Sequence, residues 1–188
     1  MEKIHIHDKV FVPFMSYGQV SEIIDGVASR LNEDFRPVYG SYADDPKEDI
    51  PIVLCVLNGA IMFTGELLER LDFPVELVSM KLSSYSGTQS TGKVRELMGL
   101  TADVRGRTVI VCEDIVDTGT TIAALKASLL EKGAADVRIC TMLLKPDVYK
   151  GDTALDYVGA SIPNKFIVGF GLDYDEQGRN LKDIYVLE

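Results

Sequence analysis

Residues 109–121 constrain the fold of this chain more than any other segment. The segment begins as a run of β-branched apolar residues, which ends abruptly in Glu113 and Asp114, and it continues through a short turn of Asp, Thr and Gly residues. The following residues, 122–130, form a helix-like apolar stretch. This order predicts a strand, a polar loop and the N-terminus of a helix.

The same alternation recurs along the chain, which predicts an α/β protein with a parallel sheet. Apolar spacing predicts helices over 17–34, 60–71 and 122–132, and strands over 51–57, 75–82, 107–112 and 136–144. Ligands of such sheets bind at the carboxyl ends of the strands. We therefore expect the loops after Leu57, Leu82 and Asp114 to lie near one another.

Length and composition exclude several classes of protein. The 188 residues suffice for one α/β domain with a sizeable core, and the net charge of −10 argues against a nucleic-acid surface. A long uncharged apolar run and a signal-peptide pattern are both missing from the sequence, so we expect a cytoplasmic protein without a membrane contact. Three cysteines, Cys55, Cys112 and Cys140, lie in or beside apolar runs, and we expect them to be buried strand residues rather than zinc ligands or disulfides.

The loop after the motif strand has the chemistry of a phosphate site. The first turn of a helix leaves N–H groups without partners and carries the positive end of the helix dipole. Gly119 lets a ligand approach the backbone, and the neighbouring polar side chains can cap the helix or add hydroxyl donors. These polar residues are Asp117, Thr118, Thr120 and Thr121.

The two acids before the loop point to a sugar or a metal. Adjacent carboxylates would repel a phosphate, so Glu113 and Asp114 make more sense facing sugar hydroxyls or a Mg²⁺ ion. A phosphorylated sugar with a metal suits both halves of the segment. The alternative is that the acids form a solvated strand end and that Asp117 or Thr118 is only a helix cap.

A polar loop over 83–93 is longer than a simple connection needs to be. Its small polar residues are typical of a mobile lid, and equally of a plain surface hairpin.

The motif at 113–121 resembles the phosphoribosyl-diphosphate-binding motif of the type I phosphoribosyltransferases, both in the order of its acids and in its Thr-Gly-x-Thr turn. Further segments resemble the hypoxanthine-guanine phosphoribosyltransferases of that family. These are 162–174, Ser84 and Tyr85 with 89–92, and 143–145, so the similarity covers nearly the whole chain from about residue 50. The resemblance implies a parallel-sheet phosphoribosyltransferase fold flanked by helices. It also implies one domain over 1–188, with a small hood lobe formed by the N-terminal residues and the C-terminal segment.

The resemblance also assigns roles to residues. Asp117 is expected near N7 of a purine as general acid and base. The sugar phosphate would be held by residues 117–121, and Glu113 and Asp114 would face the ribose hydroxyls and the metal. The remaining expected roles are Lys145 as donor to O6 of the base, Phe166 stacking on the base, the Ile167 backbone at its edge, Asp173 as a Mg²⁺ ligand, Arg179 on the diphosphate, and Ser84 and Tyr85 in the lid.

These roles imply transfer of a phosphoribosyl group from 5-phosphoribosyl 1-diphosphate to hypoxanthine or guanine, with Mg²⁺, in a homodimer or homotetramer. At Asn58-Gly59 the chain departs from the family, whose members commonly have lysine before this glycine, preceded by a peptide bond that can be cis. Two alternatives stay open. One is a nucleotide-sensing regulator on the same fold, and the other is an enzyme that prefers xanthine.

Overall fold

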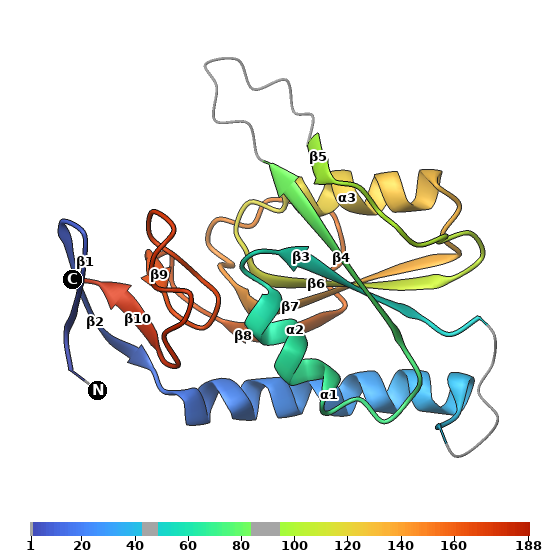
Figure 1. Ribbon diagram of the computed structural model, residues 1–188, viewed down its shortest axis with the longest axis horizontal. Helices are drawn as coiled ribbons and strands as arrows, with labels where there is room; N and C mark the ends of the chain where they lie inside the picture. Colours follow the sequence, from blue (N-terminus) through green and yellow to red (C-terminus); the bar gives the residue numbers. More distant parts are fainter. Residues whose placement is uncertain (1, 43–48, 84–94) are drawn as a thin grey trace.

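The computed structural model describes residues 2–42, 49–83 and 95–188 and contains a large and a small β-sheet (Figure 1). The large sheet has the strand order β5-β4-β3-β6-β7-β8. Its neighbours pair in parallel except at β5, which is antiparallel to β4. The strands are β3 (Ile52–Leu57), β4 (Glu76–Ser83), β5 (Arg95–Met98), β6 (Thr108–Val116), β7 (Asp136–Leu144) and β8 (Tyr157–Ser161).

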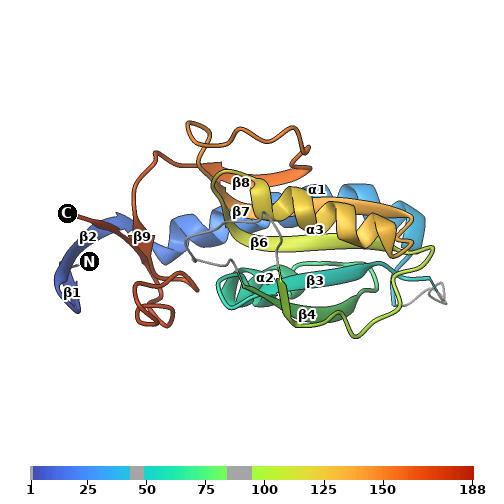
Figure 2. The same cartoon turned by 90° about the horizontal axis from the view of Figure 1, so that it is seen from above.

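Helices cover both faces of the large sheet (Figure 2). One face packs on α1 (Tyr17–Tyr39) and α2 (Ile61–Leu68), and the other packs on α3 (Thr120–Glu131). Helix α1 begins at a capping box, in which the Ser16 backbone N–H donates to Gln19 Oε1 at 2.9 Å and the Ser16 hydroxyl accepts from the Gln19 N–H. None of the helices in the described ranges is long and apolar enough to cross a membrane.

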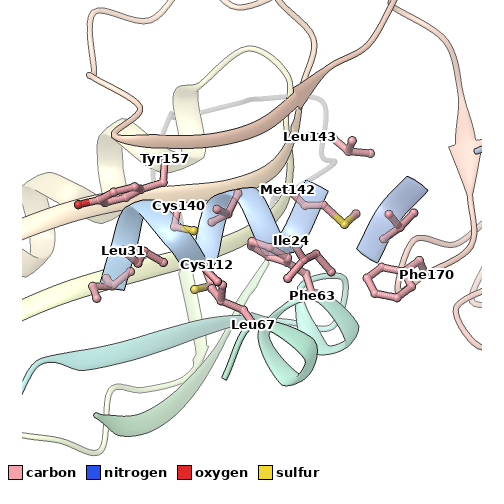
Figure 3. Close-up of a cluster of buried hydrophobic side chains, with 14 of the residues drawn as sticks. Ile24, Leu31, Phe63, Leu67, Cys112, Cys140, Met142, Leu143, Tyr157 and Phe170 are labelled. Atoms are coloured by element: carbon pink, nitrogen blue, oxygen red, sulfur yellow. The ribbon is translucent and has the colours of Figure 1, made fainter. Parts of the chain in front are cut away.

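The core beneath α1 and α2 contains two of the three cysteines, Cys112 and Cys140 (Figure 3). Cys55, Cys112 and Cys140 are register neighbours on β3, β6 and β7, and all three are buried free thiols, as predicted. Phe63 and Leu67 of α2 pack in the same cluster. Because both faces of the central strands are covered, these strands are continuous apolar runs rather than alternating ones.

The small sheet brings the two ends of the chain together. Its order is β1-β2-β10-β9, all antiparallel, with β1 (Ile4–Ile6), β2 (Lys9–Met15), β9 (Ile167–Val168) and β10 (Ile184–Leu187). Strand β10 is therefore interior although it lies last in the sequence. The sheet lies beyond one end of the large sheet (Figure 1), and its position corresponds to the expected hood.

The predicted α/β architecture is confirmed, and two details differ. The motif strand does not end at the two acids: β6 continues to Val116, because Glu113, Ile115 and Val116 remain in register with β7. The short strand β5 was not predicted. Most of the expected lid over 83–93, including Ser84 and Tyr85, lies outside the described residues.

Candidate functional site

The loop of residues 117–119 connects β6 to α3 at the carboxyl end of the sheet. Gly119, at the helix N-cap, has the left-handed backbone angle φ 83°, and a side chain does not cap the helix there. The N-terminal N–H groups of α3 are therefore not satisfied by a side-chain cap, which leaves them suited to an anion. A hollow of about 240 Å³ lies here, lined by Glu113, Ile115, Val116, Asp117, Thr118, Gly119, Thr121 and Ile122.

The hydroxyl groups of the loop do not act as the helix cap that was considered from the sequence. Thr118 Oγ1 and Thr120 Oγ1 lie 3.2 Å apart, so these two side chains share a hydrogen bond with each other. Tyr149 supports the loop from outside: a Cβ on Gly119 would overlap the Tyr149 ring, whose hydroxyl donates to the Thr153 carbonyl. Sequence reasoning missed Tyr149, because it lies 30 residues away.

The two acids of the motif are not a solvated strand end, so that alternative is wrong. Glu113 is only 8% exposed, and burial, followed by the nearby Asp114 charge, raises the pKa of its carboxyl well above its usual value. Burial also raises the pKa of Asp114, to about 6, although the Ile115 N–H donates to its Oδ1 at 2.8 Å. Glu113 is buried and Asp114 half-buried, and neither forms an ion pair within the described part of the chain, so the two carboxyls are suited to a ligand that brings hydroxyl groups or a metal.

Asp117 and Lys145 meet across the mouth of the loop. Lys145 Nζ lies 3.0 Å from Asp117 Oδ1, and Lys145 is 9% exposed whereas the Asp117 side chain is half-exposed. The Lys145 N–H donates to the Val116 carbonyl at 3.1 Å, which fixes the end of β7 beside the residue preceding Asp117. The pair therefore places a donor cation and an acceptor carboxylate side by side.

The turn after β3 abuts the acids. The Leu57–Asn58 peptide bond is cis. A Cβ on Gly59 would overlap the Asp114 carboxylate, and a Cβ on Gly171 would overlap the Gly59 carbonyl. The backbone at Gly59 is thus held between the motif strand and the C-terminal segment, and only glycine leaves room for both contacts.

Arg179 and Asp173 form an ion pair in the C-terminal segment. Arg179 Nη2 lies 2.7 Å from Asp173 Oδ1, and its Nη1 donates to the Gly171 carbonyl at 2.8 Å. The charges of both side chains act on Asp114, where Arg179 lowers the pKa and Asp173 raises it. This pair therefore belongs to the same electrostatic environment as the motif acids.

Phe166 and Ile167 lie at the edge of the small sheet. Phe166 is 45% exposed, and its carbonyl accepts from the Leu187 N–H at 2.9 Å. Ile167 is buried and pairs with Val186 of β10. An exposed aromatic ring on a rigid edge has the shape of a stacking platform.

The site offers hard oxygen ligands for a Mg²⁺ ion, but too few to complete its coordination. Glu113, Asp114 and Asp173 supply carboxylate oxygens, the donors that Mg²⁺ prefers. Within the described ranges no three His, Cys, Asp or Glu side chains converge in a way that could hold a metal alone. These residues therefore fit a Mg²⁺ ion that takes most of its ligands from a bound phosphate compound and from water.

Comparisons with known proteins identify the family to which the chain belongs. Residues 16–175 match the family model described as "Phosphoribosyl transferase domain". The chain is 42% identical over 175 residues to a hypoxanthine-guanine phosphoribosyltransferase of Streptococcus pneumoniae, covering 93% of this chain and 91% of that protein. It is 36% identical over 171 residues to the protein of the same name from Mycobacterium bovis, covering 90% and 82%.

Solved structures show the same similarity. The crystal structure of a hypoxanthine phosphoribosyltransferase from Staphylococcus aureus matches with a TM-score of 0.83 at 31% identity, covering 94% of this chain and 91% of that chain. A hypoxanthine phosphoribosyl transferase from Trypanosoma cruzi matches with a TM-score of 0.86 at 30% identity, covering 98% and 95%.

Proposed function

Because the chain belongs to the type I phosphoribosyltransferase family, and within it to the hypoxanthine-guanine phosphoribosyltransferases, we propose how its residues divide the work of that reaction. The reaction is the transfer of a phosphoribosyl group to a purine base, a step of purine salvage. The bond from C1 of the sugar to the diphosphate oxygen of 5-phosphoribosyl 1-diphosphate breaks, and a bond from C1 to a nitrogen of hypoxanthine or guanine forms, while the base gives up a proton to Asp117. The products are IMP or GMP and diphosphate.

The observation that carries the residue assignment is the Asp117–Lys145 pair at 3.0 Å beside the helix N-terminus. In a 6-oxopurine, O6 and N7 are neighbouring atoms on one edge of the base. Lys145 donates to O6, and Asp117 accepts from or donates to N7. Both side chains therefore find a hydrogen-bond partner on the same edge of the base. Adenine carries an amino group at this position and offers no acceptor to the ammonium group.

The other half of the site holds the sugar. The α3 N-terminus with Thr118, Gly119, Thr120 and Thr121 binds the 5-phosphate, and Glu113 and Asp114 accept hydrogen bonds from the ribose hydroxyls. Phe166 stacks on the base, and the Ile167 backbone meets its edge.

Arg179, with the backbone at Asn58 and Gly59, binds the diphosphate. Charge that develops on the leaving diphosphate is stabilised by Arg179. Asp173, with Glu113 and Asp114, would hold Mg²⁺, which when bound supplies further positive charge to the diphosphate. Asn58 has no charge to offer, so its contribution is limited to its amide groups.

Ser84 and Tyr85, which lie outside the described residues, complete the proposal as parts of a lid. Closure of a lid would exclude water from the oxocarbenium-like transition state. We further propose that the protein works in the cytoplasm as a homodimer or homotetramer.

The test is a spectrophotometric assay with phosphoribosyl diphosphate and Mg²⁺ against hypoxanthine, guanine, xanthine, adenine and orotate in parallel. We expect turnover of 6-oxopurines and none of adenine or orotate, and the assay ranks xanthine against the other two. Turnover of adenine would contradict the role of Lys145. Binding of phosphoribosyl diphosphate without turnover of any base would instead support a nucleotide-sensing regulator.

A further inference from the structure

Tyr174 connects the candidate site to the turn between β1 and β2, and the proposed mechanism assigns it no task. The residue directly follows Asp173. Its hydroxyl donates to Asp8 Oδ1 at 2.8 Å, and Lys9 Nζ lies 3.5 Å from Asp8 Oδ2 and 5.3 Å from the centre of the Tyr174 ring. The turn that carries Asp8 thus contacts both the polar end and the face of this tyrosine.

His7 adds further contacts between the same two turns. Its ring meets the Tyr174 ring edge-on, with centres 5.8 Å apart, and its Nε2 lies 3.3 Å from the Asp175 carbonyl oxygen. His7 and Asp175 have φ angles of 50° and 48°, which residues other than glycine seldom adopt. Two turns in unusual conformations therefore dock on each other, which is expected where the surroundings determine the backbone.

The Tyr174 ring also contacts Phe166, the exposed ring at the edge of the small sheet, and the ring of Phe11. The centre of the Tyr174 ring lies 5.8 Å from that of Phe166, with the planes at 86°, and 6.1 Å from that of Phe11. Phe11 is fully buried, whereas Phe166 is 45% exposed. The centres of the Phe11 and Phe166 rings lie 6.3 Å apart, so the exposed Phe166 ring rests against both Tyr174 and Phe11.

The backbone of Tyr174 also closes the turn that orients Asp173. The N–H of Tyr174 donates to the Gln177 carbonyl at 2.9 Å, and the N–H of Gln177 donates back at 3.1 Å. Within this turn the Glu176 N–H donates to Asp173 Oδ2 at 2.9 Å, while the other carboxylate oxygen faces Arg179. The orientation of Asp173 therefore depends on the position of the Tyr174 turn.

We propose that Tyr174, held by Asp8, is a positioning residue that sets the Phe166 ring and the Asp173 carboxylate together. This inference rests on the proposed roles of Phe166 at the base and Asp173 at the diphosphate. It predicts that one distant hydrogen bond influences the binding of both substrates. The β1–β2 turn is then a functional part of the site, although it touches neither substrate.

The test compares Tyr174→Phe, Asp8→Ala and the double variant. Glu176→Gln is the matched control, because it removes one exposed carboxylate from the same turn while keeping the size of the side chain and the backbone N–H that donates to Asp173. We expect each single variant to raise KM for both hypoxanthine and phosphoribosyl diphosphate by about threefold to tenfold. The double variant should be no worse than either single variant, because both remove the same bond.

The outcomes separate this inference from the proposed function. If the wild-type protein catalyses transfer but both single variants have KM values within twofold of the wild-type values, the inference is wrong and the proposed function stands. The same conclusion follows if the KM increases of the two single variants multiply in the double variant. A lower melting temperature or a lower kcat with unchanged KM values would show that Tyr174 stabilises the fold without positioning the site. A wild-type protein without transfer activity would overturn the proposed function itself.

Discussion

At the scale of single residues, the Asp117–Lys145 pair is the most informative contact. Lys145 is buried and lies at hydrogen-bond distance from one carboxylate, so each side chain determines the charge environment of the other. A base bound between the loop and β7 would replace this ion pair with two contacts to its own edge. The pair therefore marks the position proposed for the base.

The substitution Asp117→Asn tests that position. We expect kcat to fall by roughly 100-fold, because the amide cannot exchange a proton with N7, while KM for phosphoribosyl diphosphate changes little. Steady-state kinetics with varied sugar diphosphate measure both quantities. Asp147→Asn, at an exposed position two residues after Lys145, is the control and should leave kcat unchanged. Unchanged turnover in Asp117→Asn would remove this carboxylate from the chemistry.

Gly59 offers a second test at the residue scale, because no side chain fits beside Asp114. Gly59→Ala should reduce kcat/KM by at least 10-fold, since the Asp114 carboxylate or the turn must move. Gly65→Ala is the matched control. A Cβ there has no atom within 4 Å, and alanine should stabilise the α2 helix by about 0.5–1 kcal/mol. Activity assays and thermal unfolding distinguish the two substitutions, and an active Gly59→Ala protein would mean that the turn and Asp114 can separate.

At the scale of elements, β6, its loop and α3 form the unit proposed to bind the sugar phosphate. This unit was recognisable from sequence because it is contiguous, and its apolar run and helical spacing are local signals. The true end of β6 was not recognisable, since Glu113 and Asp114 interrupt an apolar pattern whose continuation is decided by pairing with β7. For the same reason the contact between Gly59 and Gly171 could not be predicted, because it joins segments 112 residues apart.

The loop geometry can be tested at Gly119. Gly119→Ala should raise KM for phosphoribosyl diphosphate by about 10-fold or more, because it combines an unfavourable φ of 83° with an overlap on the Tyr149 ring. Gly106→Ala has a similar φ, 73°, but open space around the new Cβ. It should cost only about 1 kcal/mol of stability and leave KM unchanged. Equal kinetic effects of both substitutions would argue against a special role of the α3 N-terminus.

At the scale of the whole molecule, the buried acids reduce the stability of the ligand-free fold. Burial raises the pKa of the Asp114 carboxyl in the folded state to about 6, above its usual value of 3.8. The folded protein therefore holds a proton between these values that the unfolded chain has released. The contribution of Asp114 to the free energy of unfolding should thus decrease as pH rises from about 4 to about 6. This loss of stability should persist at neutral pH.

Asp114→Asn measures this contribution. The variant should be more stable than wild type at pH 7 by on the order of 2 kcal/mol, with the difference vanishing near pH 4, while activity is lost. Thermal unfolding across this pH range gives the comparison. Asp103→Asn is a control in which the effect has the opposite sign. Hydrogen bonds from Arg105 lower the pKa of Asp103 to about 2. The stabilising contribution of Asp103 to the folded protein is therefore present above pH 4 and is lost in acid. A pH-independent difference between Asp114→Asn and wild type would contradict the folded-state pKa.

The small sheet has a consequence for the order in which the protein is made. Strand β2 pairs with β10, whose first residue is synthesised about 170 residues later. At roughly 5–20 residues per second, the nascent β2 waits on the order of ten to thirty seconds for its partner. Pro13 lacks an N–H group, so the unpaired β2 forms β-sheet hydrogen bonds with other chains less readily during this interval. The motif strand, its loop and α3 precede β10 by more than 50 residues, so the ribosome completes the unit proposed to bind the sugar phosphate before β10, the strand that pairs with β9 beside Phe166.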